Sequence, residues 1–270
     1  MTLSKELAQD FKHIRLGIVY ELRKHLRRKR ILIAGVLAVL VPLIFHIILI
    51  ATKAELWKYP EQYAGAIFGG YVLIIVSVAL FGADSISSEF EKKTGLLLFA
   101  TPQRRTSILV AKYFGAAIIT ALVIALSYLV SSLGLIAFYR ELSILSDILK
   151  SYFVALLYTF SVLSVAFLFS SIFKSSVLSI LLTFFLLWLI MPTVSFVLMV
   201  AKIEPWFVVT YYQELITMVF GGVTYHMAGS EHVGFEMSIP DFNTGIIIMT
   251  CYSVILFMLS VILASRRGME

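Results

Sequence analysis

The sequence predicts an all-α, polytopic membrane protein with six transmembrane helices. Of its 270 residues, 60% are hydrophobic and 14% are charged, whereas soluble proteins contain about 45–50% apolar and about 25% charged residues. Six charge-free runs of 22 to 27 residues occur, and each is long enough to cross a hydrocarbon layer about 30 Å thick as a helix. The period-2 alternation of a membrane β-barrel is missing. A soluble globular domain is therefore excluded.

Residues 1–30 are predicted to form an amphipathic helix on the cytoplasmic membrane surface. Apolar residues recur at steps of three and four: Leu3, Leu7, Phe11, Ile14, Ile18, Leu22 and Leu26. This period is typical of a helix with one apolar face. The basic cluster Arg27–Arg30 follows and is attracted to anionic headgroups. The helix is either a simple interfacial anchor or also a contact for a cytoplasmic partner.

Residues 31–265 are predicted to form one transmembrane domain, followed by a short tail at 266–270. Unpaired backbone amides cost several kcal/mol each in lipid, so the apolar runs must be helical. The runs are Ile31–Thr52, Gln62–Ala83, Tyr113–Tyr139, Ser151–Phe173, Ser175–Ala201 and Phe242–Ser265.

The basic residues predict the orientation in the cell membrane. Of the 22 Lys and Arg residues, 17 lie in the N-terminal segment, the second and fourth connections and the C-terminal end, and five lie in the other three connections. By the positive-inside rule, both termini are cytoplasmic. The net charge of +6 is thus a topology signal, and the basic groove with interleaved aromatics that would indicate a nucleic-acid partner is missing.

The segment 202–243 is predicted to be extracellular and to contain interfacial or re-entrant helices before the last span. Residues 215–230 are uncharged but too short to cross the membrane, and aromatic side chains precede them at Trp206, Phe207, Tyr211 and Tyr212. His226, Glu231 and His232 also lie here, but their irregular spacing is a weak metal signal. We therefore predict no metal site.

The helix interiors contain little that titrates. His46 is the only such group near neutrality, and we expect it to be hydrogen-bonded within the bundle or near the outer interface. Proton-coupled carriers usually keep acids at bilayer depth, so the driving energy is expected to come from elsewhere. The single cysteine, Cys251, lies in an apolar run and is expected to pack in the core.

Small residues and prolines mark special places in the helices. Gly65 with Gly69, and Ala111 with Gly115, form small-xxx-small faces that favour close helix packing. Pro192 is a possible hinge because proline removes a helical hydrogen bond.

The connection Asp84–Arg105 differs in composition from its surroundings. It predicts a short helix that Asp84 or Ser85 caps and Gly95 ends, then an apolar run from Leu96 to Phe99 and a turn at Pro102. Four bulky apolar residues in a charged loop need cover from the bilayer or from another protein.

This loop resembles that of the membrane permease subunits of type-2 ABC transporters. The motif reads acid, basic pair, Thr and Gly, a Leu run, a Pro turn, Arg and an aliphatic stretch ending in Lys. Here it corresponds to Glu89, Lys92, Lys93, Thr94, Gly95, Leu96, Leu97, Pro102, Arg105, Ile108, Leu109 and Lys112. The chain departs from the family pattern in the order Thr94-Gly95 and in the apolar residues that follow it. In outline the resemblance covers the whole chain.

The resemblance implies an exporter permease that is not itself an enzyme. The loop would be the coupling helix that docks on a cytoplasmic ABC ATPase through Glu89, Glu91, Lys92, Lys93, Gly95, Leu96, Leu97, Phe99, Pro102 and Arg105. Phe173, Lys174 and Ser175 would make a second cytoplasmic contact. The phosphate-binding pattern G-x-x-x-x-G-K-[ST] is missing from the sequence, so ATP and Mg would bind to the partner. The permease would form a homodimer, or a heterodimer with a similar permease, bound to two ATPase subunits.

Other functions stay open at this point. One is a non-transporting membrane partner of an ABC ATPase, and another is an ATP-independent channel or secondary carrier. An intramembrane enzyme is disfavoured, because no Ser-His or paired-carboxylate constellation lies at membrane depth. The sequence does not identify the transported substrate.

Overall fold

The structure is a computed structural model that describes residues 2–27, 29–51, 59–92, 103–140, 144–221 and 240–266. These ranges are helical apart from short connections and contain no strand. The larger helices are α1 (Thr2–Arg27), α2 (Lys29–Ala51), α3 (Pro60–Phe68), α4 (Val72–Phe81), α7 (Arg105–Tyr139), α8 (Leu145–Ile172), α9 (Ser176–Phe185), α10 (Met191–Val200) and α12 (Phe242–Arg266). The shorter elements are α5 (Ser87–Glu91), the π-helix η2 (Leu186–Ile190), the 3₁₀-helix η3 (Val209–Glu214) and α11 (Leu215–Met218).

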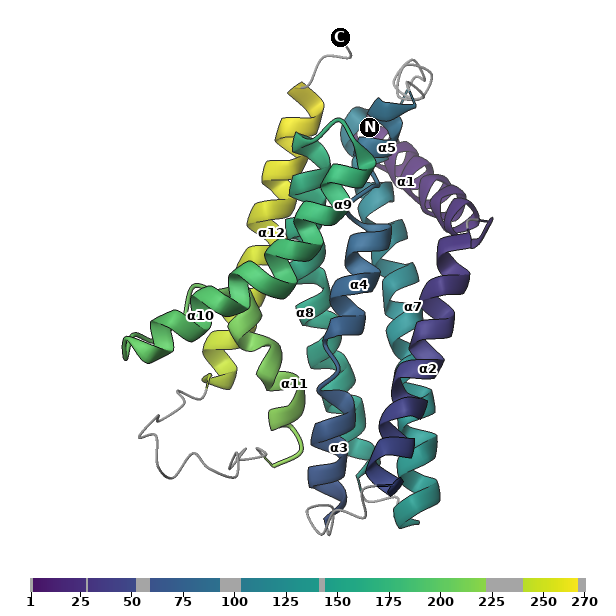
Figure 1. The fold of residues 1–270 in the computed structure, drawn as a ribbon. Coiled ribbons are helices and arrows are strands. Elements are labelled where there is room, and N and C mark those ends of the chain that lie inside the picture. Colours follow the sequence, from purple (N-terminus) through teal and green to yellow (C-terminus); the bar gives the residue numbers. More distant parts are fainter. Residues whose placement is uncertain are drawn as a thin grey trace.

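Among the described residues, six spans are long and apolar enough to cross a membrane, which confirms the predicted all-α polytopic architecture. α2, α7, α8 and α12 each make one span, α3 and α4 together make the second, and Ser176–Val200 makes the fifth. Figure 1 shows α1, α5 and the end of α12 at one end of the bundle, which we call the terminal end. The opposite, or distal, end carries the start of α3 and the end of α7.

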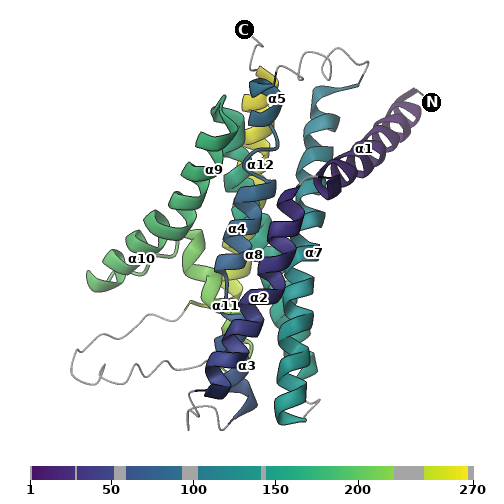
Figure 2. The same ribbon diagram turned by 45° about the vertical axis from the view of Figure 1, so that its right-hand side comes forward.

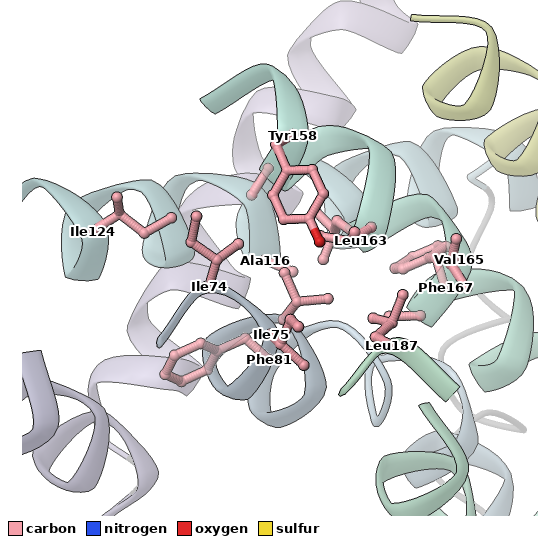
Figure 3. Close-up of a cluster of buried hydrophobic side chains, with 14 of the residues drawn as sticks. Ile74, Ile75, Phe81, Ala116, Ile124, Tyr158, Leu163, Val165, Phe167 and Leu187 are labelled. Carbon is pink, nitrogen blue, oxygen red and sulfur yellow. The ribbon is translucent and has the colours of Figure 1, made fainter. Parts of the chain in front are cut away.

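The core lies where α4, α7 and α8 meet. Figure 3 shows Ile75 and Phe81 of α4 and Leu163 and Phe167 of α8 pointing into this cluster. Leu187 of η2 joins them and is fully buried. These side chains interdigitate and so fix the relative positions of three spans.

Serine side chains hold α12 against α8. Ser161 Oγ donates to the Met249 carbonyl at 2.7 Å, and Ser164 Oγ donates to the Ser253 carbonyl at 2.9 Å. Small polar residues allow close approach of helices in a membrane. Cys251 lies on the exposed side of α12, so the prediction that it packs in the core was wrong. An apolar run in a membrane protein can face lipid as well as protein.

The second predicted helix is broken in the middle. α3 ends at Phe68 and α4 begins at Val72, so the expectation of one helix over 62–83 was wrong. Gly69 ends α3, and a Cβ at that position would lie 3.0 Å from the Gly65 carbonyl and 3.3 Å from Thr217 Cγ2. The predicted small pair therefore marks a helix break against α11.

The third predicted helix is longer than its charge-free run. α7 begins at Arg105 and not at Tyr113, and it includes Lys112. The charge-free run is bounded by this lysine, whose charge has two acidic partners in the folded chain.

The fifth span changes its helical period. α9 is followed by the π-helix η2 and then by α10, whose second residue is Pro192. π-helical segments frequently occur at functional sites. Figures 1 and 2 both show α10 running away from the other helices. The role of Pro192 as a hinge stays a prediction.

The distal end contains the predicted histidine contact. His46 is buried, and its Nδ1 lies 2.6 Å from the Tyr63 hydroxyl, which confirms hydrogen bonding within the bundle. The short helices η3 and α11 follow the fifth span, and Ser151 Oγ donates to the Ile216 carbonyl at 2.7 Å. Their depth in the membrane stays a prediction. His226, Glu231 and His232 lie outside the described residues.

Candidate functional site

The first part of the predicted coupling loop is built into the terminal end of the bundle. Residues 84–88 are buried, and Asp84 is 1% exposed. Its carboxylate forms an ion pair with Arg30 at the start of α2, and Arg30 Nη1 also donates to the Leu80 carbonyl at 3.4 Å. The loop thus begins as a continuation of α4 that is attached to α2.

A serine of α8 holds the start of α5. Ser170 Oγ accepts hydrogen bonds from the Ile86 amide at 2.9 Å and from the Ser87 amide at 3.0 Å. Ser85 Oγ donates to the Phe81 carbonyl instead. The prediction that Asp84 or Ser85 caps this helix was therefore wrong, because an unpaired amide can donate to any well-placed oxygen and tertiary packing supplies one from α8.

Four charged residues join the loop to α1 and α7, of which Glu21 and Lys112 are buried and Lys24 and Glu89 are half-buried. Lys112 Nζ of α7 lies 2.7 Å from Glu21 Oε1 of α1 and 2.9 Å from Glu89 Oε1 of α5. Lys24 Nζ of α1 lies 2.7 Å from Glu89 Oε1 and 3.3 Å from Glu21 Oε2. Each lysine contacts both glutamates. We call these four residues the ion cluster.

The electrostatics of the ion cluster are balanced. Burial raises the pKa of the Glu21 carboxyl, but Lys112 and Lys24 outweigh it, and the pKa is lowered overall. Burial and the neighbouring Lys112 lower the pKa of Lys24, against the opposing effect of the two glutamates. The two lysines and two glutamates sum to zero net charge. Removal of one member would leave an uncompensated charge in a place with little water.

Small residues bring α1 close enough to α7 for these contacts. A Cβ at Gly17 would lie 2.6 Å from Ala111 Cβ, and a Cβ at Gly115 would lie 2.7 Å from Glu21 Cβ. The predicted pair Ala111 and Gly115 therefore does mark close helix packing, and its partner is the N-terminal helix. Phe11 of the predicted apolar stripe is 71% exposed, so the face that packs on α7 is rotated from that stripe.

The structure brings the two predicted docking segments together. Glu91 Oε2 accepts a hydrogen bond of 2.7 Å from the Ser176 amide, the first residue of α9. The side-chain and backbone hydrogen bonds of Ser176 lower the pKa of the Glu91 carboxyl. A carboxylate at this position also interacts favourably with the helix dipole. Lys174 and Ser175, directly before α9, are exposed beside this contact.

Arg105 begins α7 and reaches the other end of the chain. Its Nη1 donates to the Ser265 carbonyl at 3.0 Å, near the end of α12. The neighbouring Arg104 pairs with Asp10 of α1 at 3.1 Å. Arg105 is exposed, so its contact with α12 leaves part of the side chain on the surface of the terminal end.

The predicted docking residues have different surroundings. Lys92 is exposed, Phe173 is half-buried, and Glu89 is directed into the ion cluster rather than outward. A contact of Glu89 with an ATPase stays a prediction. Six predicted residues lie outside the described part of the chain: Lys93, Gly95, Leu96, Leu97, Phe99 and Pro102.

Sequence reasoning missed Glu21 and Lys24, which were assigned to the polar face of an interfacial helix. A signal was present, because Gly17, Glu21 and His25 follow one another at steps of four and so share a helix face. A glycine on that face indicates close approach of another helix. Ser170 carried no distinguishing signal.

Comparison with known proteins assigns the family. A search of curated proteins gave no match. The family model of the ABC-2 family transporter proteins matches residues 18–189, from the middle of α1 to the π-helix. The matched region contains the ion cluster, the loop, the first four spans and the first part of the fifth, and it is more than half of the chain. The chain therefore belongs to the ABC-2 family of transporter proteins and is a multi-pass membrane permease.

Proposed function

We propose that this chain is the permease of an ABC exporter, and that it receives mechanical work from a separate cytoplasmic ATPase through the loop between α4 and α7. Two permeases, identical or similar, would form the pathway, and two ATPase subunits would bind ATP and Mg. Both termini would be cytoplasmic, which makes the terminal end the docking side. Membership of the ABC-2 family supports the ATPase as partner.

One observation carries the proposal: the loop is attached to several helices at once. Glu89 connects α5 to α1 and α7, Ser170 connects it to α8, and Glu91 connects it to α9. A force on α5 would reach α1, α7, α8 and α9 through these direct contacts. Closure of two ATPase domains is a rigid-body motion, and such a motion needs a stiff element to reach the membrane.

The docking step is tested with Leu97→Asp and Phe99→Asp. These changes should detach the ATPase during co-purification and abolish coupled ATP hydrolysis, because apolar anchors dominate protein interfaces. The matched control is Phe11→Asp, which places the same charge on an exposed residue of α1 and should leave the ATPase bound. Unchanged co-purification of the double variant would remove the loop from the docking role.

Transmission is tested separately from docking with Glu89→Gln. The ATPase should still co-purify, but transport per ATP hydrolysed should fall, because the loop loses its charged link to α1 and α7. The assay uses the permease and its ATPase in vesicles with a panel of candidate solutes. Hydrolysis without movement of any solute would instead favour a non-transporting partner. Transport by the permease alone would favour a channel or secondary carrier.

A further inference from the structure

A groove lies between α2 and the broken second span. Its volume is about 430 Å³, and its walls include Leu37, Val41 and Phe45 of α2 together with Gly70, Tyr71 and Val76. The residues that line it in the described part of the chain are all uncharged. Pockets that bind small molecules have volumes of about 300–1,000 Å³ and mainly apolar walls with a few polar groups. The groove has the size and the surface of such a site.

The groove lies beside the middle of the second span. The second span covers Pro60–Phe81, and the break at 69–71 is at its centre. Pro42 of α2 lies opposite, because it lines a small pocket with Phe68 and Gly70. Non-helical backbone at this depth is tolerated only where protein buries it or where it lines a cavity. The broken second span thus faces the proline of a continuous α2, beside one groove.

Polar groups at the break are not fully paired. The Tyr71 amide donates to the Gly69 carbonyl at 2.8 Å and the Leu73 amide to the Gly70 carbonyl at 3.2 Å, whereas the Gly70 amide makes no backbone hydrogen bond among the described residues. Unpaired groups are costly in hydrocarbon.

Building on the proposed function, we propose that this groove binds the transported molecule, an uncharged amphiphile with a hydrocarbon body and an oxygen that accepts a hydrogen bond. The uncharged walls exclude an ionic solute, because a charge at bilayer depth is expensive. A helix of a second permease would not satisfy the Gly70 amide, because the backbone groups of that helix are already hydrogen-bonded to one another. An ester or hydroxyl oxygen would instead accept from the Gly70 amide, while the hydrocarbon body packs against Leu37 and Val41.

The experiment uses a photoreactive monoacylglycerol with a diazirine in its acyl chain. The purified permease is placed in phosphatidylcholine nanodiscs without ATPase, labelled by light, and mapped by peptide mass spectrometry. Gly70→Leu fills the groove, because a Cβ there meets only the Ile67 carbonyl, at 3.6 Å. Gly35→Leu is the matched control on α2, where a Cβ meets nothing within 4 Å.

We expect label on peptides 37–45 and 66–76 of the unmodified chain. Gly70→Leu should lower that label by about tenfold, which corresponds to about 1.4 kcal/mol of lost binding, and Gly35→Leu should leave it unchanged. Leu37→Trp fills the groove from the opposite wall and should give the same loss if Gly70→Leu does not fold. Equal labelling of all variants would mean annular lipid only and would overturn the proposal.

The result is separable from the proposed function, because labelling requires no ATPase. If labelling is selective but no ATP-driven transport of any amphiphile is found, the exporter proposal fails and the binding site remains. If Gly70→Leu loses the label but still exports amphiphiles at the normal rate, the groove is not the cargo site.

Discussion

The span α8 and the span Ser176–Val200 are similarly apolar but differ in what surrounds them. In α8, 67% of the apolar stretch is buried, whereas only 17% is buried in Ser176–Val200. Serines and aromatic side chains attach α8 to α7 and α12, while α10 runs away from the bundle (Figure 2). Hydropathy alone therefore does not separate a core helix from one whose surface is left to lipid or to another chain.

The largest expected effect is the loss of a buried charge at the terminal end of the bundle. Lys112→Met should lower the free energy of unfolding by about 3–5 kcal/mol, because Glu21 and Glu89 keep their charges with only Lys24 left to compensate them. Denaturant titration of the purified permease in detergent measures this. A change below about 1 kcal/mol would show that water, and not Lys112, compensates the glutamates.

The same substitution in the two spans sharpens the comparison. Phe167→Ala on α8 should lower the free energy of unfolding by about 3 kcal/mol, since Phe167 is fully buried and its loss leaves a cavity. Phe196→Ala on α10 should change stability by less than about 0.5 kcal/mol in the single chain, because Phe196 is 61% exposed. Thermal unfolding of both variants at low protein concentration tests the pair. Equal costs would mean that α10 is packed as tightly as α8.

Close packing of α1 on α7 is tested by adding side-chain volume. Gly115→Val should lower the free energy of unfolding by about 1–3 kcal/mol and expose α1 to proteolysis, because the Cβ would overlap Glu21. Gly35→Val is the control, since nothing lies within 4 Å of a Cβ there. Limited proteolysis followed by mass spectrometry reports where cleavage occurs. Protection of α1 in Gly115→Val would contradict the observed helix approach.

The smallest expected effect near neutral pH is the change of stability with pH that Glu21 causes. The folded pKa of Glu21 lies below its unfolded value of about 4.3, so unfolding takes up a proton and acid favours the unfolded state. The contribution of Glu21 is complete above about pH 4.3 and disappears as pH falls through the folded pKa. A pocket of about 260 Å³ beside Glu21 and Lys112 gives protons access.

Thermal stability measured from pH 7 to pH 3 should thus be flat and then fall, and Glu21→Gln should reduce the fall. A Glu21→Gln profile identical to that of the unmodified chain would show that other carboxyls cause it.

Much of the fold could be predicted because membrane insertion depends on local composition. The six spans, the N-terminal helix and the burial of His46 follow from hydropathy, helical period and the cost of unpaired polar groups. Helix ends were less predictable. α7 extends through Lys112 because two glutamates from distant segments compensate its charge, and no local rule contains that information.

The candidate site likewise has a part that the sequence predicted and a part that it did not. The sequence pointed to the loop Asp84–Arg105 by its composition, and the family match agrees with the interpretation of a transporter permease. It did not reveal that Glu89 is directed inward, or that Ser170 supplies the cap of α5. Both depend on contacts between residues more than 60 positions apart in the chain: Glu89 contacts Lys24, and Ser170 contacts Ile86.

By itself the sequence determined that this is a six-span, all-helical membrane protein, because in hydrocarbon every backbone amide must find its partner within its own helix. Only the tertiary structure decided which charges meet, where the second span breaks and which span leaves the bundle. Those outcomes depend on side chains from distant segments sharing one place, and a helical pattern specifies a face but not its partner.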